Sequence, residues 1–351
     1  MCRKRIRRIR PMRKGCPPDV NERDGCRVEQ RSDNRMPTPT QREVMILVNP
    51  NAGARTRDDE VGRLVETLAS RGHPTHRSTS LDDACREANA LHASGRLQAL
   101  VGVGGDGTMA ELVNRTDPGV PIAILPAGTA NLLSQHLGFH RSVAQWVEAI
   151  ARGRTIRLDA GRANGRLFTL MLGCGFDAEV VRELEAGRTG HIGRFAYFRP
   201  IARALAHYGF PKMLIYCDDC KVATEDTTPA EPFEAGWLFA FNLPCYGGGF
   251  RFAPASDGRD GLLDVCTFRQ TARWHGVRYF AALVLRSHRR LADCRFLRTG
   301  RLRIDAEDKV PYQLDGDFAG YLPVEVEVLP ERLTLVIPPD SPYQPKDETA
   351  T

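Results

Sequence analysis

Hydrophobic positions in the first part of the chain fall into two kinds of pattern. Val44–Val48, Leu97–Val103 and Ile122–Leu125 are unbroken apolar runs, as expected of strands buried on both faces of a parallel sheet. Between them, apolar residues recur at helical spacing. The expected helices span residues 58–71, which Gly72 ends, 82–94, 109–114 and 132–137, and a short strand is expected at Pro74–Ser78. Strands that alternate with helices predict a doubly wound parallel sheet.

The pattern changes after Gly153. Apolar segments become short, often alternate with polar residues, and are separated by turns, which is typical of an antiparallel β-sandwich. Three helices are expected to interrupt it, at Ala178–Ala186, Phe195–Tyr208 and Arg273–Arg286. The expected domains are therefore 43–155 and 156–338, followed by a tail at 339–351. The expected strands are Leu167–Leu172, Met213–Tyr216, Trp237–Asn242, Leu263–Phe268, Leu302–Ile304, Val324–Leu329 and Leu333–Ile337.

Charge is concentrated at the N-terminus. Residues 1–42 hold 13 Lys and Arg against 5 Asp and Glu, whereas the rest of the chain is close to neutral. This tail lacks periodicity and is interpreted as disordered. It is a solvated arm, a nucleic-acid or anionic-lipid contact, or a segment upstream of a true start at Met36. We favour the first and third interpretations and predict no nucleic-acid partner, because nothing else in the chain supports one.

Composition excludes several classes of protein. A chain of 351 residues with 42% hydrophobic and 26% charged residues is neither disordered nor fibrous, and its length suits two domains. No apolar run reaches the ~18 residues of a membrane-spanning helix, and no secretory signal follows the basic start. The ten cysteines are irregularly spaced and are interpreted as reduced thiols of a cytoplasmic protein, with no second pair to make Cys217 and Cys220 a zinc site.

Three loops that follow predicted strands carry the candidate chemistry. They are Asn49–Gly53, Gly104–Thr108 and Ala127–Asn131. Parallel strands end at one edge of a sheet, so these loops converge there, and glycine-rich turns that open helices suit phosphate groups. Thr108 is expected to cap its helix. Asp106 needs a Mg²⁺ ion or a proton-transfer task, since a bare carboxylate repels phosphate. Together the loops predict a site for a nucleotide polyphosphate.

These motifs resemble the diacylglycerol kinase catalytic domain family, which includes sphingosine kinases, ceramide kinases and bacterial lipid kinases. The matching segments in order are NPNAG at 49–53, GGDGT at 104–108, PAGTAN at 126–131, GFDA at 175–178, GGG at 247–249 with Ala253-Pro254 and DGLLD at 260–264, and LDGD at 314–317. The resemblance implies a Rossmann-like α/β domain joined to a β-sandwich, with the active site in the cleft between them. It also implies phosphorylation of a lipid hydroxyl with ATP and Mg²⁺.

The resemblance also implies roles for individual residues. Asp315 is the expected general base and Asp106 its rival, with Asp106 otherwise holding the nucleotide and its Mg²⁺. A second Mg²⁺ is expected at Asp260. Asp177 is expected either to contact the lipid head group or to cap a helix. The remaining expected contacts are Asn49, Ser78, Gly104, Gly105, Gly107, Thr108, Met109, Ala110, Thr129 and Asn131 with the nucleotide, Asp257 and Leu262 with the second Mg²⁺, and Asp317 with the substrate.

Two departures from the family pattern leave alternatives open. Ala110 stands where relatives commonly have Asn, and Asp317 stands where they have Glu. The acceptor that the resemblance implies is diacylglycerol, a sphingoid base, ceramide or phosphatidylglycerol. The alternatives are a kinase similar to NAD kinases, which share the GGDGT loop, and a catalytically weak regulator that binds lipid or nucleotide.

A basic segment predicts how the chain reaches lipid. Between Arg269 and Arg303 there are ten Arg and one acid, Asp293. Trp274, Val277 and nearby apolar residues share a helical face, so the helix suits the anionic inner face of a membrane as a peripheral partner. The alternative is a helix that packs on its own sandwich and turns a solvated basic face outward. The family resemblance leaves a homodimer open.

Overall fold

The computed structural model describes residues 42–48, 58–187, 198–217, 220–222, 232–247, 253 and 256–343. Residues 40–351 form one compact unit. The predictions made for residues 1–41, for the Asn49–Gly53 loop, and for Gly248, Gly249 and Pro254 lie outside the described residues. No described helix is both long enough and apolar enough to cross a bilayer.

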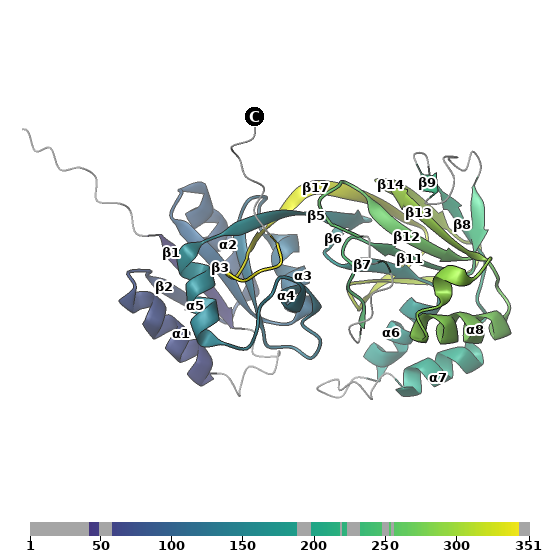
Figure 1. Cartoon of the computed structure of the whole chain (residues 1–351), viewed down its shortest axis with the longest axis horizontal. Coiled ribbons are helices and arrows are strands. Elements are labelled where there is room, and N and C mark those ends of the chain that lie inside the picture. The colour runs from purple at the N-terminus through teal and green to yellow at the C-terminus, as the bar shows by residue number, and fades with distance from the viewer. Residues whose placement is uncertain are drawn as a thin grey trace, which may run out of the picture. The chain divides into compact units, whose positions relative to one another are not determined.

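The first part of the unit is the predicted α/β fold (Figure 1). Its strands pair in parallel in the order β4-β3-β1-β2. Every residue of the first strand is buried, which explains its unbroken apolar run. The elements are β1 Glu43–Val48, α1 Asp58–Ser70, β2 Thr75–Ser78, α2 Leu81–Ala93, β3 Leu97–Gly104, α3 Asp106–Arg115, β4 Pro121–Pro126, α4 Leu132–His136 and α5 Val143–Arg152.

The second part contains an antiparallel sheet of seven strands in the order β16-β15-β7-β11-β12-β13-β9. The elements of this second part, in that sheet and outside it, include β6 Arg166–Phe168, β7 Met171–Cys174, α6 Phe176–Ala186, α7 Phe198–His207, β8 Met213–Tyr216, β9 Lys221–Val222, β10 Phe233–Ala235, β11 Trp237–Phe241 and β12 Leu263–Phe268. The chain continues through α8 Arg273–Val284, the 3-10 helix η4 His288–Arg290, β13 Cys294–Thr299, β14 Arg301–Asp305, β15 Pro311–Leu314 and β16 Asp317–Tyr321.

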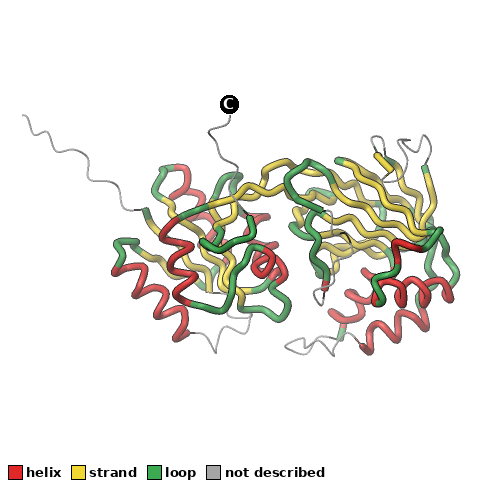
Figure 2. Tube along the Cα trace, viewed as in Figure 1, coloured by secondary structure: helices red, strands yellow, loops and turns green. Residues whose placement is uncertain are grey.

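One long strand joins the two parts. β17, Val324–Val336, pairs with β14 and with β5, Thr155–Ala163, in antiparallel fashion. Its end pairs in parallel with β4, with Thr334 opposite Pro121 and Leu335 opposite Ile122. The α/β sheet therefore runs through β17 into a second layer of strands, β14, β8 and β10. Figure 2 shows this continuous run of strands.

The seven-stranded sheet is covered on both faces. Leu238 and Ala240 of β11 face the sandwich core, which also holds Ile304 and Val324 of the other layer. Trp237, Phe239 and Phe241 point to the opposite side and join the core that includes Phe176 of α6 and Tyr279 of α8. All five residues of β11 are consequently buried. The helices α6, α7 and α8 lie along this side of the sheet in Figure 1.

Several local predictions are corrected. α3 begins at Asp106 with Gly105 as its N-cap, so Thr108 lies inside the first turn and does not cap the helix. Leu167–Leu172 is divided between β6 and β7, and the two expected C-terminal strands are a single strand with an irregularity between Leu329 and Leu333. The run continues because both segments pair with the same long partner, β5.

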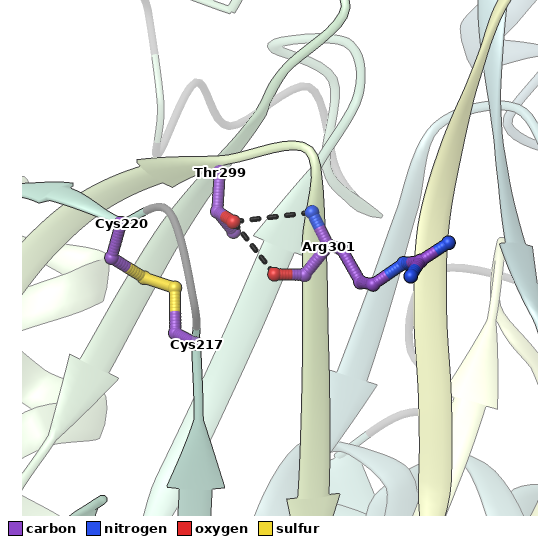
Figure 3. The surroundings of a disulfide bond; sticks show 4 residues. All are labelled: Cys217, Cys220, Thr299 and Arg301. Atoms are coloured by element: carbon purple, nitrogen blue, oxygen red, sulfur yellow. Dashed lines mark hydrogen bonds between the residues drawn. A yellow bond between two sulfur atoms is a disulfide. The ribbon is translucent and has the colours of Figure 1, made fainter. Parts of the chain in front are cut away.

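The cysteine prediction is wrong at one pair. Cys217 and Cys220 form a disulfide at the end of β8 (Figure 3). Beside it, the Thr299 hydroxyl accepts a hydrogen bond from the Arg301 backbone N–H at 3.1 Å and donates to the Arg301 carbonyl at 2.7 Å. Among the described residues, Cys85, Cys174, Cys245, Cys266 and Cys294 are not in disulfides, as expected.

Candidate active site

Two glycine-rich loops of the α/β sheet touch each other backbone to backbone. A Cβ atom at Gly105 would lie 3.1 Å from the Cα of Gly128, and a Cβ at Gly128 would lie 2.7 Å from the Cα of Gly105. The Ala127 N–H donates to the Gly104 carbonyl at 2.8 Å. A Cβ at Gly104 would meet Thr108 Oγ1 at 2.1 Å. Glycine therefore allows this close approach. Two of the three loops predicted to converge do so, and the third, Asn49–Gly53, lies outside the described residues.

Asp106, in the Gly104–Thr108 loop, holds the Ala127–Asn131 loop in place. Its two carboxylate oxygens accept hydrogen bonds from the backbone N–H groups of Leu132 at 3.0 Å and Leu133 at 3.1 Å, at the start of α4. Asn131 closes the loop, since its Oδ1 accepts from the Gly128 N–H and its Nδ2 donates to the Gly128 carbonyl, both at 2.7 Å. Burial raises the pKa of Asp106, and the bonds from Leu132 and Leu133 oppose that shift.

The start of α3 is open to an anion. Its N-cap residue is Gly105, which has no side chain to hydrogen-bond the first N–H groups of the helix, and Gly107 in the first turn is exposed. A helix start of this kind offers backbone N–H groups and the positive end of the helix dipole. Thr108, Met109 and Ala110 are buried, and Met109 is part of the hydrophobic core. Met109 and Ala110 can therefore meet a nucleotide only through their backbone.

The LDGD segment forms a β-hairpin. Leu314 of β15 pairs with Asp317 of β16, which leaves Asp315 and Gly316 as a two-residue turn. Both turn residues have positive φ, 53° at Asp315 and 95° at Gly316. An Asp-Gly pair with two positive φ angles is the preferred sequence for this tight hairpin turn. The backbone alone therefore gives Asp315 a structural reason to be there.

The carboxylate of Asp315 is fully engaged with the chain segment before β7. Its Oδ2 accepts from the Thr169 N–H at 2.6 Å and the Thr169 hydroxyl at 2.9 Å. Its Oδ1 accepts from the N–H groups of Leu170 at 2.8 Å and Met171 at 3.0 Å. A carboxylate has about four lone-pair positions, and these four donors use them. Burial raises the pKa of Asp315 to about 6, against the opposing effect of these bonds.

Asp317 is the carboxylate of the hairpin that reaches the glycine loops. A Cβ atom built on Gly107 would lie 3.5 Å from Asp317 Oδ2. The second domain therefore presents an acid directly at the first turn of α3. The adjacent Phe318 N–H donates to Glu185 of α6 at 2.8 Å, which helps to fix the start of β16.

Asp177 is buried and neither caps a helix nor lies at the surface. Gly175, not Asp177, is the N-cap of α6. The Tyr246 hydroxyl donates to Asp177 Oδ1, and Gln313 Nε2 donates to its Oδ2 at 2.8 Å. Burial raises the pKa of Asp177, and these two bonds oppose the shift. The predicted head-group contact stays a prediction without support from this geometry.

Sequence reasoning missed the residues that hold the hairpin. Gln313 is buried, and its Oε1 accepts from the Gly316 N–H at 2.7 Å while its amide binds Asp177. Asn242 is also buried and donates to the carbonyls of Asp159 at 2.9 Å and Thr169 at 2.8 Å. Neither residue lies in a recognisable motif. Their signal is an amide side chain in an otherwise apolar strand, which requires a buried partner.

The side chains around Asp260 are already paired, and the second Mg²⁺ expected there, with the backbone carbonyls of Asp257 and Leu262 as its partners, stays a prediction. Arg298 forms an ion pair with Asp260 Oδ2 and lies 3.3 Å from Asp264 Oδ1, so a cation of the chain already faces these carboxylates. Asp260 Oδ1 accepts from the Leu262 N–H at 3.0 Å, and Asp257 pairs with Arg259 at 2.8 Å. No group of three or more His, Cys, Asp or Glu in the described part of the chain could hold a metal ion.

Two further predicted contacts lie at loop ends. Ser78 ends β2, where its hydroxyl donates to the Ser80 carbonyl at 3.0 Å, and Thr129 is exposed in the loop before α4. A surface groove of about 560 Å³ lies elsewhere, on the β8, β14 and β17 layer, and includes none of the predicted site residues. It is lined by Tyr216, Arg301, Leu302, Arg303, Glu325, Val326 and Glu327.

Comparison with known proteins agrees with this arrangement. Residues 43–163 match the family model of the diacylglycerol kinase catalytic domain, and residues 171–337 match the YegS C-terminal NAD kinase beta sandwich-like domain. A diacylglycerol kinase of Bacillus subtilis (strain 168) is 23% identical over 313 residues, which cover 87% of this chain and 100% of the relative. A diacylglycerol kinase of Mycobacterium tuberculosis (strain ATCC 25618 / H37Rv) is 27% identical over 307 residues, 84% of this chain and 95% of the relative.

The fold is also seen in a solved structure. The crystal structure of a diacylglycerol kinase from Bacillus anthracis str. Sterne has a TM-score of 0.60 and 20% sequence identity, and the match covers 86% of this chain and 98% of that one. The family matches begin at β1 and continue to β17, so they include the glycine loops and the hairpin described above. The chain therefore carries a diacylglycerol kinase catalytic domain followed by a YegS C-terminal NAD kinase beta sandwich-like domain, and it is a kinase.

Proposed function

We propose that this kinase transfers the γ-phosphoryl group of ATP to a hydroxyl of diacylglycerol or a related lipid alcohol, at the cytoplasmic face of a membrane. The observation that carries the proposal is the proximity of Asp317 to Gly107. It brings a carboxylate of the second domain next to the Gly104–Thr108 loop of the first domain, which we expect to bind phosphate. Curated relatives that span nearly the same length bear the name diacylglycerol kinase. Diacylglycerol is therefore the first acceptor to test.

The residues at the start of α3 fit a nucleotide polyphosphate. Gly107 is exposed in the first turn of α3, where a helix start offers backbone N–H groups to phosphate oxygens, and the hydrogen bonds of Asp106 to Leu132 and Leu133 keep the Ala127–Asn131 loop in place. Asp106 is the acid that would hold a Mg²⁺ ion here. Such an ion neutralises charge on the transferring phosphoryl group.

Asp317 is the general base that this geometry favours. A base must keep a lone pair for the attacking hydroxyl, and Asp315 gives its four positions to Thr169, Leu170 and Met171. Asp317 accepts the proton of the lipid hydroxyl as that oxygen bonds to the γ-phosphorus and the bond to the β-phosphate oxygen breaks, which releases ADP. Asp315 acts on the reaction by holding the hairpin that carries Asp317.

The test is phosphate transfer from γ-labelled ATP with Mg²⁺, using the full chain and mixed micelles of diacylglycerol, sphingosine, ceramide or phosphatidylglycerol, with NAD as a water-soluble acceptor. We expect label in diacylglycerol. Asp317→Asn should lower kcat by about 10²- to 10⁴-fold, the usual contribution of a general base, with an unchanged melting temperature.

Two matched variants make the assignment specific. Asp315→Asn replaces an acceptor by an N–H₂ donor that faces backbone N–H groups, so it should lower the melting temperature and reduce kcat less than Asp317→Asn does. Full kcat in Asp317→Asn would reject the base assignment. Label in NAD alone would reject the lipid acceptor, and ATP binding without transfer to any acceptor would favour a regulator.

A further inference from the structure

Exposed apolar side chains gather on two helices of the second domain. Six large hydrophobic residues are exposed in the described part of the chain, and five of them lie on α7, on α8 or directly after α8. Phe198 is 76% exposed, Trp274 63% and Leu285 75%. The helices α7 and α8 contact each other along the same side of the seven-stranded sheet (Figure 1). The other two residues are Val277 and Val284.

α8 is apolar on both of its sides. Gly276, Tyr279 and Leu283 are buried against the sheet side, where a Cβ at Gly276 would overlap the Phe210 ring at 1.9 Å. The solvent side carries Trp274, Val277, Ala281 and Val284 at intervals of three or four residues, and all four are exposed. As the alternative interpretation of the sequence expected, the helix packs on its own sheet and exposes Arg273 and Arg278, but its exposed side also carries these apolar residues. A helix with a second apolar side needs a second apolar partner.

The apolar stripe is bordered by cations that lack acidic partners. Arg278 pairs with Asp293, the single acid between Arg269 and Arg303, and Tyr279 donates to the same carboxylate at 2.6 Å. Arg203 of α7 lies 3.8 Å from Glu183. Among the residues that the structure describes, no carboxylate lies within ion-pair distance of five other arginines on or beside the two helices. These are Arg199, Arg273, Arg286, Arg289 and Arg290.

The exposed apolar residues and the arginines beside them distinguish between two candidate partners of this surface, a second copy of the chain and an anionic bilayer. In a two-fold dimer the same surface meets itself, so these arginines would face the arginines of the second copy without compensating acids. The surface of an anionic bilayer offers phosphate groups to the arginines and an apolar interior to the side chains between them. Trp is suited to the boundary of the two, because its ring is amphipathic.

We propose that Phe198 and Arg199 of α7, the exposed side of α8, and Leu285 to Arg290 form a docking surface for anionic phospholipid bilayers, hereafter the α7–α8 face. The proposal deepens the proposed function, on which it rests, by naming the surface that brings the active site to its lipid. Trp274, Val277, Val284 and Leu285 enter the head-group region, and the arginines bind lipid phosphates.

The test is co-sedimentation of the full chain with sucrose-loaded vesicles. Vesicles of phosphatidylglycerol and phosphatidylcholine are compared with phosphatidylcholine alone. Arg289→Glu/Arg290→Glu should weaken binding to the anionic vesicles by about 30-fold, since each cation contributes roughly 1 kcal/mol at such a surface. Trp274→Glu/Val277→Glu should weaken it at least as much. Arg63→Glu/Arg86→Glu is the matched control on α1 and α2, with the same change of charge, and should bind like the unchanged chain.

The outcomes separate this surface from the active site. Phosphorylation of a short-chain diacylglycerol, supplied below its micelle concentration, should be the same in the α7–α8 variants and the unchanged chain. Unaltered vesicle binding in both α7–α8 variants would overturn the proposal. So would a dimer that Trp274→Glu/Val277→Glu converts to monomers, because the face would then be a subunit interface. Vesicle binding that depends on this face, in a chain that phosphorylates no lipid, would support the surface and reject the proposed function.

Discussion

The glycine-loop site and the α7–α8 face treat their polar and apolar groups in opposite ways. In the first, Asp106, Asn131 and Asp315 each hold two or more named hydrogen bonds within the chain, and glycines allow backbone contacts shorter than a side chain permits. On the second, large apolar residues are exposed, and five arginines have no carboxylate within ion-pair distance in the described part of the chain, although Arg278 pairs with Asp293. A fixed geometry suits a chemical reaction. Exposed apolar side chains and arginines without acidic partners suit a surface that binds a membrane reversibly.

This difference between the two regions predicts where a small substitution lowers the rate or the stability. A methyl group matters little on an open helix but displaces backbone in the loops. Substitutions in the two regions should therefore separate the rate of the chemical step from the binding of lipid surfaces. Three changes test how rigid the first region is, in order of expected effect.

Gly128→Ala should have the largest effect. Its Cβ would lie 2.7 Å from the Cα of Gly105 and 3.0 Å from Asn131 Oδ1, so the loops must move apart. We expect kcat/KM to fall by about 10²-fold, as misplacement by about 1 Å can cause, and stability to fall by about 1–3 kcal/mol. Steady-state rates and urea unfolding measure the two effects.

Gly62→Ala is the control for that change. Gly62 lies on α1 with no atom within 4 Å of its would-be Cβ, so alanine should leave the rate unchanged and favour the helix by up to about 1 kcal/mol. An equal loss of rate in both variants would contradict the steric account.

Acidification should affect the rate near pH 6 through Asp315. Burial raises its pKa to about 6, and only the ionised carboxylate satisfies all four donors of the Thr169–Met171 segment. We expect kcat/KM to fall below about pH 6. Because the pKa is higher in the folded state, this group favours folding most below its ordinary pKa of 3.8 and loses that contribution as pH rises through 6.

Protonation of this group therefore does not itself unfold the chain on acidification, and the loss of rate should occur while the protein is still folded. Rates and melting temperatures measured from pH 5 to 9 test both statements. The acid limb should be absent in Asp315→Asn. A limb that persists there belongs to another carboxyl group.

Arg298→Ala should have the smallest effect. The variant leaves Asp260 and Asp264 without their cation, and partly exposed ion pairs contribute about 1 kcal/mol or less. We expect a melting temperature lower by a few degrees that millimolar Mg²⁺ partly restores, whereas Mg²⁺ leaves the unchanged chain as it is in the absence of ATP. Equal stabilisation of both chains by Mg²⁺ would show a metal site that coexists with Arg298.

The sequence predicted the parts of the molecule that rest on local pattern. Unbroken apolar runs located β1, β3 and β4, and the glycine motifs located the loops that meet at Gly105 and Gly128. It could not decide which side of α8 packs on the sheet, because both sides of that helix carry apolar residues and their periodicity does not say which side is buried. It also missed the saturation of Asp315, which depends on N–H groups about 145 residues earlier in the chain.

The hairpin shows the same limit in one motif. An Asp-Gly pair predicts a turn, and the family resemblance predicts a catalytic acid, but the letters do not say which of Asp315 and Asp317 does which. The answer depends on the fold of β7 and on the approach of α3, both distant in sequence.

The pairing of β17 with β4 has a consequence for how the protein is made. The first domain's sheet lacks a neighbour beside β4 until residues 334–335 are available, and these lie some 210 residues after β4 in the chain. On the ribosome, the glycine loops therefore emerge long before their sheet can be completed, and an open strand edge of this kind attracts other chains. The sheet that carries the glycine loops is thus completed late in synthesis, and a chain truncated before β17 leaves the ribosome with that edge uncovered.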